Sequence, residues 1–179
     1  MRPARTPDRL RKALAAMLLA CAAPALAQQG SMHEVKAGFL LNFMKYAEWP
    51  EPALPSATLV VCSTGGASLG GKLELLQGRQ ALGREIRVRA PARPAEWREC
   101  QLLFVPADDA ARVDAVLRAV GQWPVLTVSD APDFAADGGI IGLRERAGRI
   151  RFDINQGAAK RAGLTLSSQL LRLADDVIP

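Results

Sequence analysis

The chain of 179 residues has little of what most catalytic and metal sites need. Its single histidine, His33, argues against a Ser-His-Asp triad and against a histidine-based zinc site. Three cysteines are too few for a disulfide-dense miniprotein, and a hydrophobic content of 49% excludes a disordered or collagen-like chain. The length suffices for one domain with a substantial core.

The N-terminus has the pattern of an export signal. Residues 2–12 carry five basic residues and one acidic residue, and the uncharged run over residues 13–27 has 15 residues, fewer than the roughly 18 that a membrane span needs. The run ends in Ala25-Leu26-Ala27, the small-x-small pattern that signal peptidase cuts. We therefore predict a signal peptide over residues 1–27, cleaved after Ala27, and a mature domain over residues 28–179.

A lipoprotein is the alternative form of export. Leu18-Leu19-Ala20-Cys21 resembles a lipobox, in which Cys21 would carry the lipid. Leu19 fits the second position of that motif poorly, whereas the Ala-Leu-Ala site is good, so we favour cleavage after Ala27 and a location in the periplasm.

The formal charge of +5 suggests a nucleic-acid-binding protein at first sight. Cleavage after Ala27 removes five basic residues and one acidic residue, which leaves 18 basic and 17 acidic residues and a charge of +1. No run of basic residues with interleaved aromatic residues remains in the mature chain. We therefore expect no nucleic-acid partner.

Cys62 and Cys100 are the two cysteines of the predicted mature chain. Cys62 falls late in one apparent strand and Cys100 at the start of another, so two adjacent parallel strands in simple register would hold the Cα atoms too far apart to bridge. That geometry favours two buried free thiols. An oxidising compartment favours a disulfide, and we favour the disulfide because the register is uncertain.

The mature chain alternates helix and strand signals. Apolar residues at helical spacing predict a helix over residues 34–48, which Trp49-Pro50 ends. Further helical stretches are predicted over residues 69–76 and 110–120. Apolar or alternating runs predict strands over residues 58–62, 86–89, 101–105 and 125–128.

The pattern changes after residue 134. Residues 140–143 and 150–154 flank a turn that contains Gly148, which predicts an antiparallel hairpin. Asn155 and Ser167 are well placed to cap two short helices. The whole pattern predicts a single-domain α/β/α sandwich with a mostly parallel sheet and a C-terminal antiparallel hairpin.

No motif in the chain predicts catalysis. Residues 66–72 follow a predicted strand as a phosphate-binding loop would, but Leu73 stands where that motif needs a hydroxyl for Mg²⁺. We interpret this stretch as a glycine-rich turn. The acidic pairs Asp108-Asp109 and Asp175-Asp176 are adjacent in sequence and do not converge on one atom. We predict no enzyme, no cofactor and no metal.

Short blocks spread over the mature chain resemble one family of exported bacterial proteins, the YfiR family (DUF4154). No single block is diagnostic, but their order and number make the resemblance fairly specific. The blocks are Val35–Phe43 with Glu48-Trp49-Pro50, Gly83-Arg84, Cys100–Phe104, Val125–Asp130, Gly138–Ile141, Arg151–Asn155 and Leu170–Ala174.

The resemblance implies a regulator. The family's characterised role is a periplasmic repressor that binds the periplasmic sensor domain of an inner-membrane diguanylate cyclase and lowers cyclic-di-GMP synthesis, with consequences for biofilm regulation. An outer-membrane lipoprotein sequesters the repressor, or redox stress misfolds it. The resemblance also implies a homodimer and a Cys62–Cys100 disulfide. The chain lacks a second cysteine pair that some relatives carry near the hairpin, where Gly142 and Arg149 stand here.

The strand over residues 150–154 alternates apolar and charged side chains, so one of its faces is open to a partner. We expect partner contacts at Arg151, Asp153 and Asn155, with Lys45 and Trp49 as neighbours. The alternative function is a periplasmic small-molecule sensor with a ligand in the cleft near residues 63–66 or 129–130, at the carboxyl ends of the strands. An enzyme with a site that lacks histidine ranks last.

Overall fold

The computed structural model describes residues 23–54, 57–66 and 68–179. The chain divides into two compact units, residues 1–32 and residues 33–179. Most of the predicted export signal and Cys21 lie outside the described residues, so both forms of export stay predictions. Among the described residues, no helix is long and apolar enough to cross a membrane.

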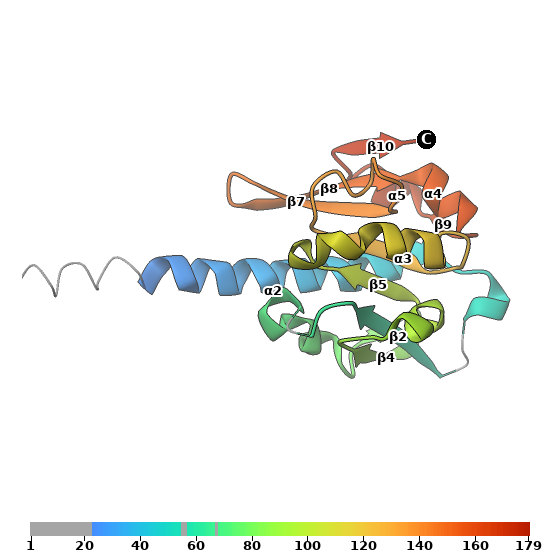
Figure 1. The fold of residues 1–179 in the computed structure, drawn as a ribbon, viewed down its shortest axis with the longest axis horizontal. Coiled ribbons are helices and arrows are strands. Elements are labelled where there is room, and N and C mark those ends of the chain that lie inside the picture. Colours follow the sequence, from blue (N-terminus) through green and yellow to red (C-terminus); the bar gives the residue numbers. More distant parts are fainter. Residues whose placement is uncertain (1–22, 55–56, 67) are drawn as a thin grey trace, which may run out of the picture. The chain divides into compact units, whose positions relative to one another are not determined.

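An eight-stranded sheet organises the second unit within the described part of the chain (Figure 1). Its order is β10-β8-β7-β6-β5-β2-β4-β3, and all neighbours are parallel except the antiparallel pairs β7–β8 and β3–β4. The strands are β2 (Thr58–Ser63), β3 (Gln80–Ala81), β4 (Arg84–Arg89), β5 (Leu102–Val105), β6 (Leu126–Ser129), β7 (Ile141–Arg146), β8 (Arg149–Asn155) and β10 (Asp176–Ile178). The predicted mostly parallel sheet with an antiparallel hairpin is confirmed.

Helices flank this sheet. The α-helices are α2 (Ala23–Tyr46), α3 (Val113–Val120), α4 (Gln156–Arg161) and α5 (Ser168–Leu171). Four 3-10 helices join them in the described chain: η1 (Glu51–Ala53), η2 (Ser68–Leu76), η3 (Pro94–Glu99) and η4 (Ala107–Arg112). Asn155 and Ser167 cap α4 and α5 as predicted, because their side-chain oxygens accept hydrogen bonds from the backbone N–H groups of Ala158 and Leu170.

Three helix predictions differ from the structure. The first predicted helix begins at Ala23 rather than residue 34, and it ends at Tyr46 rather than residue 48 because β1 (Ala47–Glu48) pairs with β9 (Thr165–Leu166). The stretch over residues 69–76 is a 3-10 helix whose residues Leu69, Gly70 and Gly71 have positive φ angles, so no regular α-helix follows β2. The helix predicted from residue 110 is regular only from Val113.

The two faces of the sheet carry separate cores. Leu103 and Val105 of β5 pack with Val116 of α3 in one cluster. Across the paired strands, Phe152 of β8 lies on the opposite face, where its ring contacts that of Phe43 on α2 at 5.1 Å between centroids. The sheet therefore lies between α3 and the C-terminal part of α2, which is the predicted sandwich.

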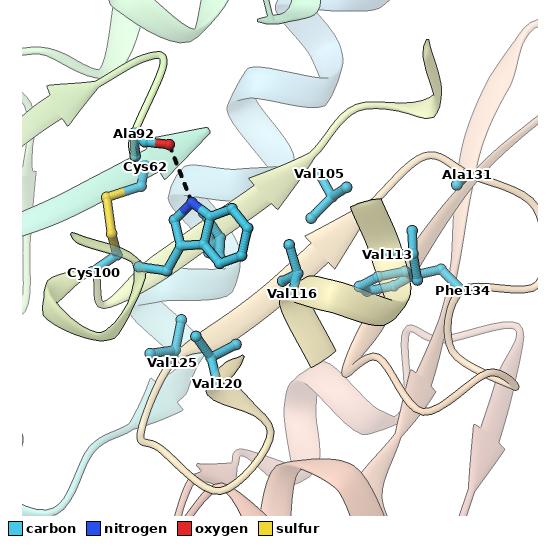
Figure 2. Packing of buried hydrophobic residues seen from close by; sticks show 12 residues of the cluster. Cys62, Ala92, Cys100, Val105, Val113, Val116, Val120, Val125, Ala131 and Phe134 are labelled. Carbon is cyan, nitrogen blue, oxygen red and sulfur yellow. Dashed lines mark hydrogen bonds between the residues drawn. A yellow bond between two sulfur atoms is a disulfide. The ribbon is translucent and has the colours of Figure 1, made fainter. Parts of the chain in front are cut away.

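A disulfide joins Cys62 and Cys100 in the α3-side cluster. Figure 2 shows the bond beside Ala92 at one end of the cluster, with Phe134 at the other. Trp97 belongs to the same cluster and donates its indole N–H to the Ala92 carbonyl at 3.1 Å. Both cysteine side chains are buried, at 0% and 1% exposure.

The disulfide prediction is confirmed, and the register argument against it was wrong. Cys62 pairs with Leu103, so a regular β5 extended back to Cys100 would hold the two Cα atoms roughly three residues apart along the strand, about 10 Å. Cys100 lies instead at the end of η3, before β5 begins at Leu102. The bend there brings the Cα atoms to 5.9 Å, which a disulfide spans.

Candidate functional surface

The β7–β8 hairpin turns through Ala147 and Gly148 (Figure 1). Both residues have positive φ angles, 50° and 71°, as the two central residues of a type I′ turn require. This turn matches the right-handed twist of the strands, and it places Arg146 directly opposite Arg149. The turn therefore sets which side chains face each other along the hairpin.

One face of the hairpin belongs to the core. Leu143, Ile150 and Phe152 are buried, because alternate residues of a strand point to the same face. The Phe152 ring packs edge-on against Phe39 and Phe43 of α2, with centroids 5.9 and 5.1 Å away. Such aromatic contacts and the buried area hold the hairpin on the domain.

The opposite face carries four arginines, Arg144, Arg146, Arg149 and Arg151, which we call the arginine face. Arg144 stands directly opposite Arg151 in the ladder, and Arg146 directly opposite Arg149. All four are exposed. Like charges directly opposite each other in a sheet are destabilising, so this arrangement costs folding free energy.

Carboxylates compensate only one end of the arginine face. Arg144 donates to Asp153 at 2.6 Å, and Arg151 lies 3.5 Å from a carboxylate oxygen of Asp175. Arg146 and Arg149, nearer the turn, have no ion pair with any residue that the structure describes. The tip of the hairpin is therefore a site of uncompensated positive charge.

Asp153 lies where acidic and basic groups meet. It pairs with Asp176 across the β8–β10 ladder, and its side chain is 17% exposed. Burial raises the pKa of Asp153 above its ordinary value, and the neighbouring carboxylates of Asp176 and Asp175 raise it further, while Arg144 opposes both effects. An added cation beside this carboxylate would favour its ionised form.

A shallow groove of about 520 Å³ runs along the arginine face. Its lining consists of Arg146, Ala147, Arg149, Arg151 and Asp175. Guanidinium groups are planar donors that bind carboxylates and phosphates through two parallel hydrogen bonds. The groove is therefore suited to an anionic group rather than to an apolar one.

The structure places the five predicted contact residues in different environments. Arg151 and Asp153 lie on the arginine side of β8, and Lys45 is exposed on the last turn of α2. Trp49 is 6% exposed, and its indole N–H has no acceptor among the described residues. Asn155 is also 6% exposed, and its amide donates to the Ala135 carbonyl while its oxygen caps α4.

Partner contact at these five positions stays a prediction. Asn155 and Trp49 are buried in the isolated chain, so a partner would reach them only after a rearrangement. Sequence reasoning missed Arg144, Arg146 and Arg149, although their spacing contained the signal. Extending the two predicted strands to a two-residue turn at Ala147 and Gly148 puts all four arginines on one face.

The cleft at the carboxyl ends of β2, β5 and β6 is the second candidate site. It has a volume of about 230 Å³, and Asp130 is among its lining residues. Asp130 already accepts hydrogen bonds from Lys36 at 2.5 Å and from the Ala107 backbone at 2.7 Å. Ser129 also donates to the Val105 carbonyl at 2.6 Å, whereas the buried hydroxyl of Thr64, directly after β2, has no partner among the described residues.

Neither a phosphate-binding loop nor a metal site forms among the described residues. Lys72, which a phosphate-binding loop would direct at phosphate, forms an ion pair with Glu34 at 2.5 Å. Within the described ranges, no three His, Cys, Asp or Glu side chains come together as metal ligands would.

Comparison with known proteins gives a family match and a fold match. The family model described as DUF4154, YfiR/HmsC-like, matches residues 33–175. A crystal structure of a conserved domain protein from Vibrio cholerae O1 biovar El Tor is similar with a TM-score of 0.52, 16% identity and 70% of this chain covered. The ABC domain in complex with L-Trp from Streptococcus pneumonia has a TM-score of 0.50, 13% identity and 77% coverage.

These two structural similarities concern the fold alone. The chain spans 56% of the length of the first protein and 59% of the second. Identities this low carry no information on ligands or partners. They agree with the α/β architecture, a central sheet flanked by helices.

Proposed function

Because the chain belongs to the YfiR/HmsC-like family, we propose that it is a periplasmic negative regulator that binds the periplasmic domain of an inner-membrane diguanylate cyclase. Binding lowers cyclic-di-GMP synthesis. The family is a regulatory one, associated with diguanylate cyclase signalling in the periplasm. The observation that carries the proposal is the match over residues 33–175, which is nearly all of the second unit.

The proposal is consistent with an action through surface contacts. A repressor acts by binding one state of its target more tightly than another, and the shift in population is limited by that difference in affinity. Moving a two-state cyclase from almost fully active to almost fully inactive needs a difference of about 10⁴-fold. A large or well-paired interface supplies such a difference without any reacting group in the regulator.

Deletion of the gene tests the proposal directly. We expect cellular cyclic-di-GMP to rise on deletion and to fall again on complementation. We also expect the exported protein to co-purify with the periplasmic domain of one membrane cyclase. An unchanged cyclic-di-GMP level in a strain that expresses the cognate cyclase would refute the proposal.

We further propose that the Cys62–Cys100 bond keeps the regulator folded in an oxidising compartment. The bond closes a loop with a sequence separation of 38, for which the chain-entropy relation gives about 4 kcal/mol of stabilisation. That is a large part of the stability of an ordinary domain. Because both sulfurs lie in the core, we expect reduction only when the domain opens.

Export by the predicted signal peptide is part of the proposal. Intact mass spectrometry of the secreted protein under non-reducing conditions would report cleavage after Ala27, lipid on Cys21 and the disulfide together. We expect an unlipidated chain that starts at Gln28, and a homodimer by light scattering. A mass that includes acyl groups would favour the lipoprotein.

A small-molecule sensor is the alternative function. The cleft near Asp130 has a volume of about 230 Å³, below the roughly 300–1,000 Å³ of most ligand pockets. Asp130 is also engaged by Lys36 and the Ala107 backbone, which favours the repressor over the sensor. A ligand-dependent rise in melting temperature across a metabolite panel would favour the sensor over the repressor.

The family resemblance also suggests a second protein partner for the repressor, an outer-membrane lipoprotein.

A further inference from the structure

We propose that the tip of the arginine face, Arg146 with Arg149, binds an acidic segment of a partner protein. This inference deepens the proposed function and rests on it only in taking the partner to be a protein. It assigns the chemistry of the contact: carboxylates of the partner against guanidinium groups of the hairpin.

The arrangement of the four arginines costs folding free energy. Two successive cross-strand pairs, Arg144 with Arg151 and Arg146 with Arg149, bring like charges together on one face of one hairpin. Each such pair opposes folding. Asp153 and Asp175 form ion pairs with the first two arginines, whereas neither Arg146 nor Arg149 forms an ion pair with a described residue. An anion supplied by a partner would offset the second pair.

The shape of the groove on the arginine face also suits an acidic segment. Arg146, Arg149 and Arg151 line a groove of about 520 Å³ together with the turn residue Ala147 and with Asp175, which pairs with Arg151. Their side chains come from both strands, so a segment that follows the hairpin can meet a guanidinium group from each side. Paired, planar donors of this kind favour carboxylates arranged along an extended chain.

The mixed charge around the arginine face favours a protein segment over a membrane surface as its partner. Asp153 and Asp176 lie farther from the turn on the same side of the sheet, and Asp175 lines the groove and pairs with Arg151. A uniformly anionic lipid surface would meet repulsion there, and the arginine face has no exposed aromatic or long apolar side chain to insert. A polypeptide can present carboxylates to the tip and a cation to the aspartates, which makes the two charge patterns complementary.

The test uses the exported protein and a fluorescent decamer of glutamate, with a decamer of glutamine as the uncharged control. We expect fluorescence anisotropy to show binding of the glutamate peptide about tenfold tighter than binding of the glutamine peptide at low salt. The difference should shrink as salt is raised, because the contacts are exposed.

Two variants locate the site. R146E/R149E should weaken binding of the glutamate peptide about tenfold. R79E/R87E is the matched control, since it makes the same change in net charge at two exposed arginines outside the hairpin, and it should bind nearly as the wild type does. R149E alone should melt no lower than the wild type, because the new carboxylate attracts Arg146 where two guanidinium groups repelled each other, and it should still lose peptide binding.

Three results would overturn the inference. Equal affinity for both peptides would show that the tip does not select carboxylates. Equal losses in R146E/R149E and R79E/R87E would assign the effect to net charge. Tighter binding to phosphatidylglycerol vesicles than to the peptide, with the same dependence on Arg146 and Arg149, would assign the face to a membrane.

The same variants separate this inference from the proposed function. If R146E/R149E loses the peptide and still represses the cyclase, the acidic-segment site stands, and repression uses another surface. If deletion of the gene leaves cyclic-di-GMP unchanged while the peptide data hold, the proposed function fails and the site remains.

Discussion

The α3-side face of the sheet differs between the region around Cys62 and the β7–β8 hairpin. Around Cys62 this face is covered by α3 and η3, and its side chains are apolar, buried and joined by a disulfide. Along the hairpin the same face carries arginines that no helix covers within the described residues, while its other face packs on Phe43. The first region contributes stability, and the second keeps charge exposed at a cost in stability. Buried apolar side chains and exposed charge are therefore divided between two regions of one sheet.

The largest effect is expected from removing the disulfide. C62S/C100S should lower the free energy of unfolding by about 4 kcal/mol, because the unfolded chain regains the entropy that the loop had lost. Urea denaturation measures it, with the reduced wild-type protein as a second sample. A loss below about 1 kcal/mol would show that the core around α3 holds without its crosslink.

The next effect tests the packed face of the hairpin. Phe152→Ala removes a ring that is 5% exposed and contacts both Phe39 and Phe43. We expect the free energy of unfolding to fall by about 3 kcal/mol, because the burial of the ring is lost and a cavity remains in its place. Phe152→Leu is the control and should cost less. Equal stability of Phe152→Ala and the wild type would show that the hairpin is not anchored on α2.

A smaller and opposite effect is expected on the arginine face. R149E replaces a repulsive cross-strand pair by an attractive one with Arg146, so it should raise stability by about 0.5 kcal/mol. R79E serves as the control for net charge. A clear loss of stability in R149E alone would mean that the arginines already stabilise the hairpin, which would remove the contrast between the two regions.

The smallest effect concerns pH. Burial raises the pKa of Asp153 above its ordinary value of 3.8, so the protonated carboxyl group favours the folded state. This contribution to stability is complete below pH 3.8 and is lost as the pH rises through the higher pKa of the folded state. D153N does not titrate there. The melting temperature of D153N relative to the wild type should therefore increase as the pH rises across this window. A constant difference between about pH 3 and about pH 7 would contradict the burial effect.

Sequence patterns predicted the parts of the fold that depend on local signals. The apolar runs located β2, β5 and β6, and the side chains of Asn155 and Ser167 identified two helix starts. The short strands β9 and β10 were missed, because two or three residues carry no periodicity and their pairing depends on distant segments.

The geometry of the disulfide and the arginine face show two other limits of prediction from the sequence. Pairing of Cys62 with Cys100 could be expected from the compartment, but its geometry depends on where η3 ends, which no pattern around Cys100 announces. The arginine face was predictable in principle from strict alternation about a two-residue turn. It was missed because the predicted strands, residues 140–143 and 150–154, are shorter than β7 and β8 and leave out Arg144, Arg146 and Arg149.

We propose that this domain represses through an exposed charged surface while its disulfide-linked core keeps it folded. Cyclic-di-GMP in a deletion strain that carries either the wild-type gene or R146E/R149E tests it most directly, with periplasmic protein levels matched. We predict that the wild-type gene restores the low level and that R146E/R149E leaves it high, although both proteins melt alike. Full repression by R146E/R149E would contradict the account.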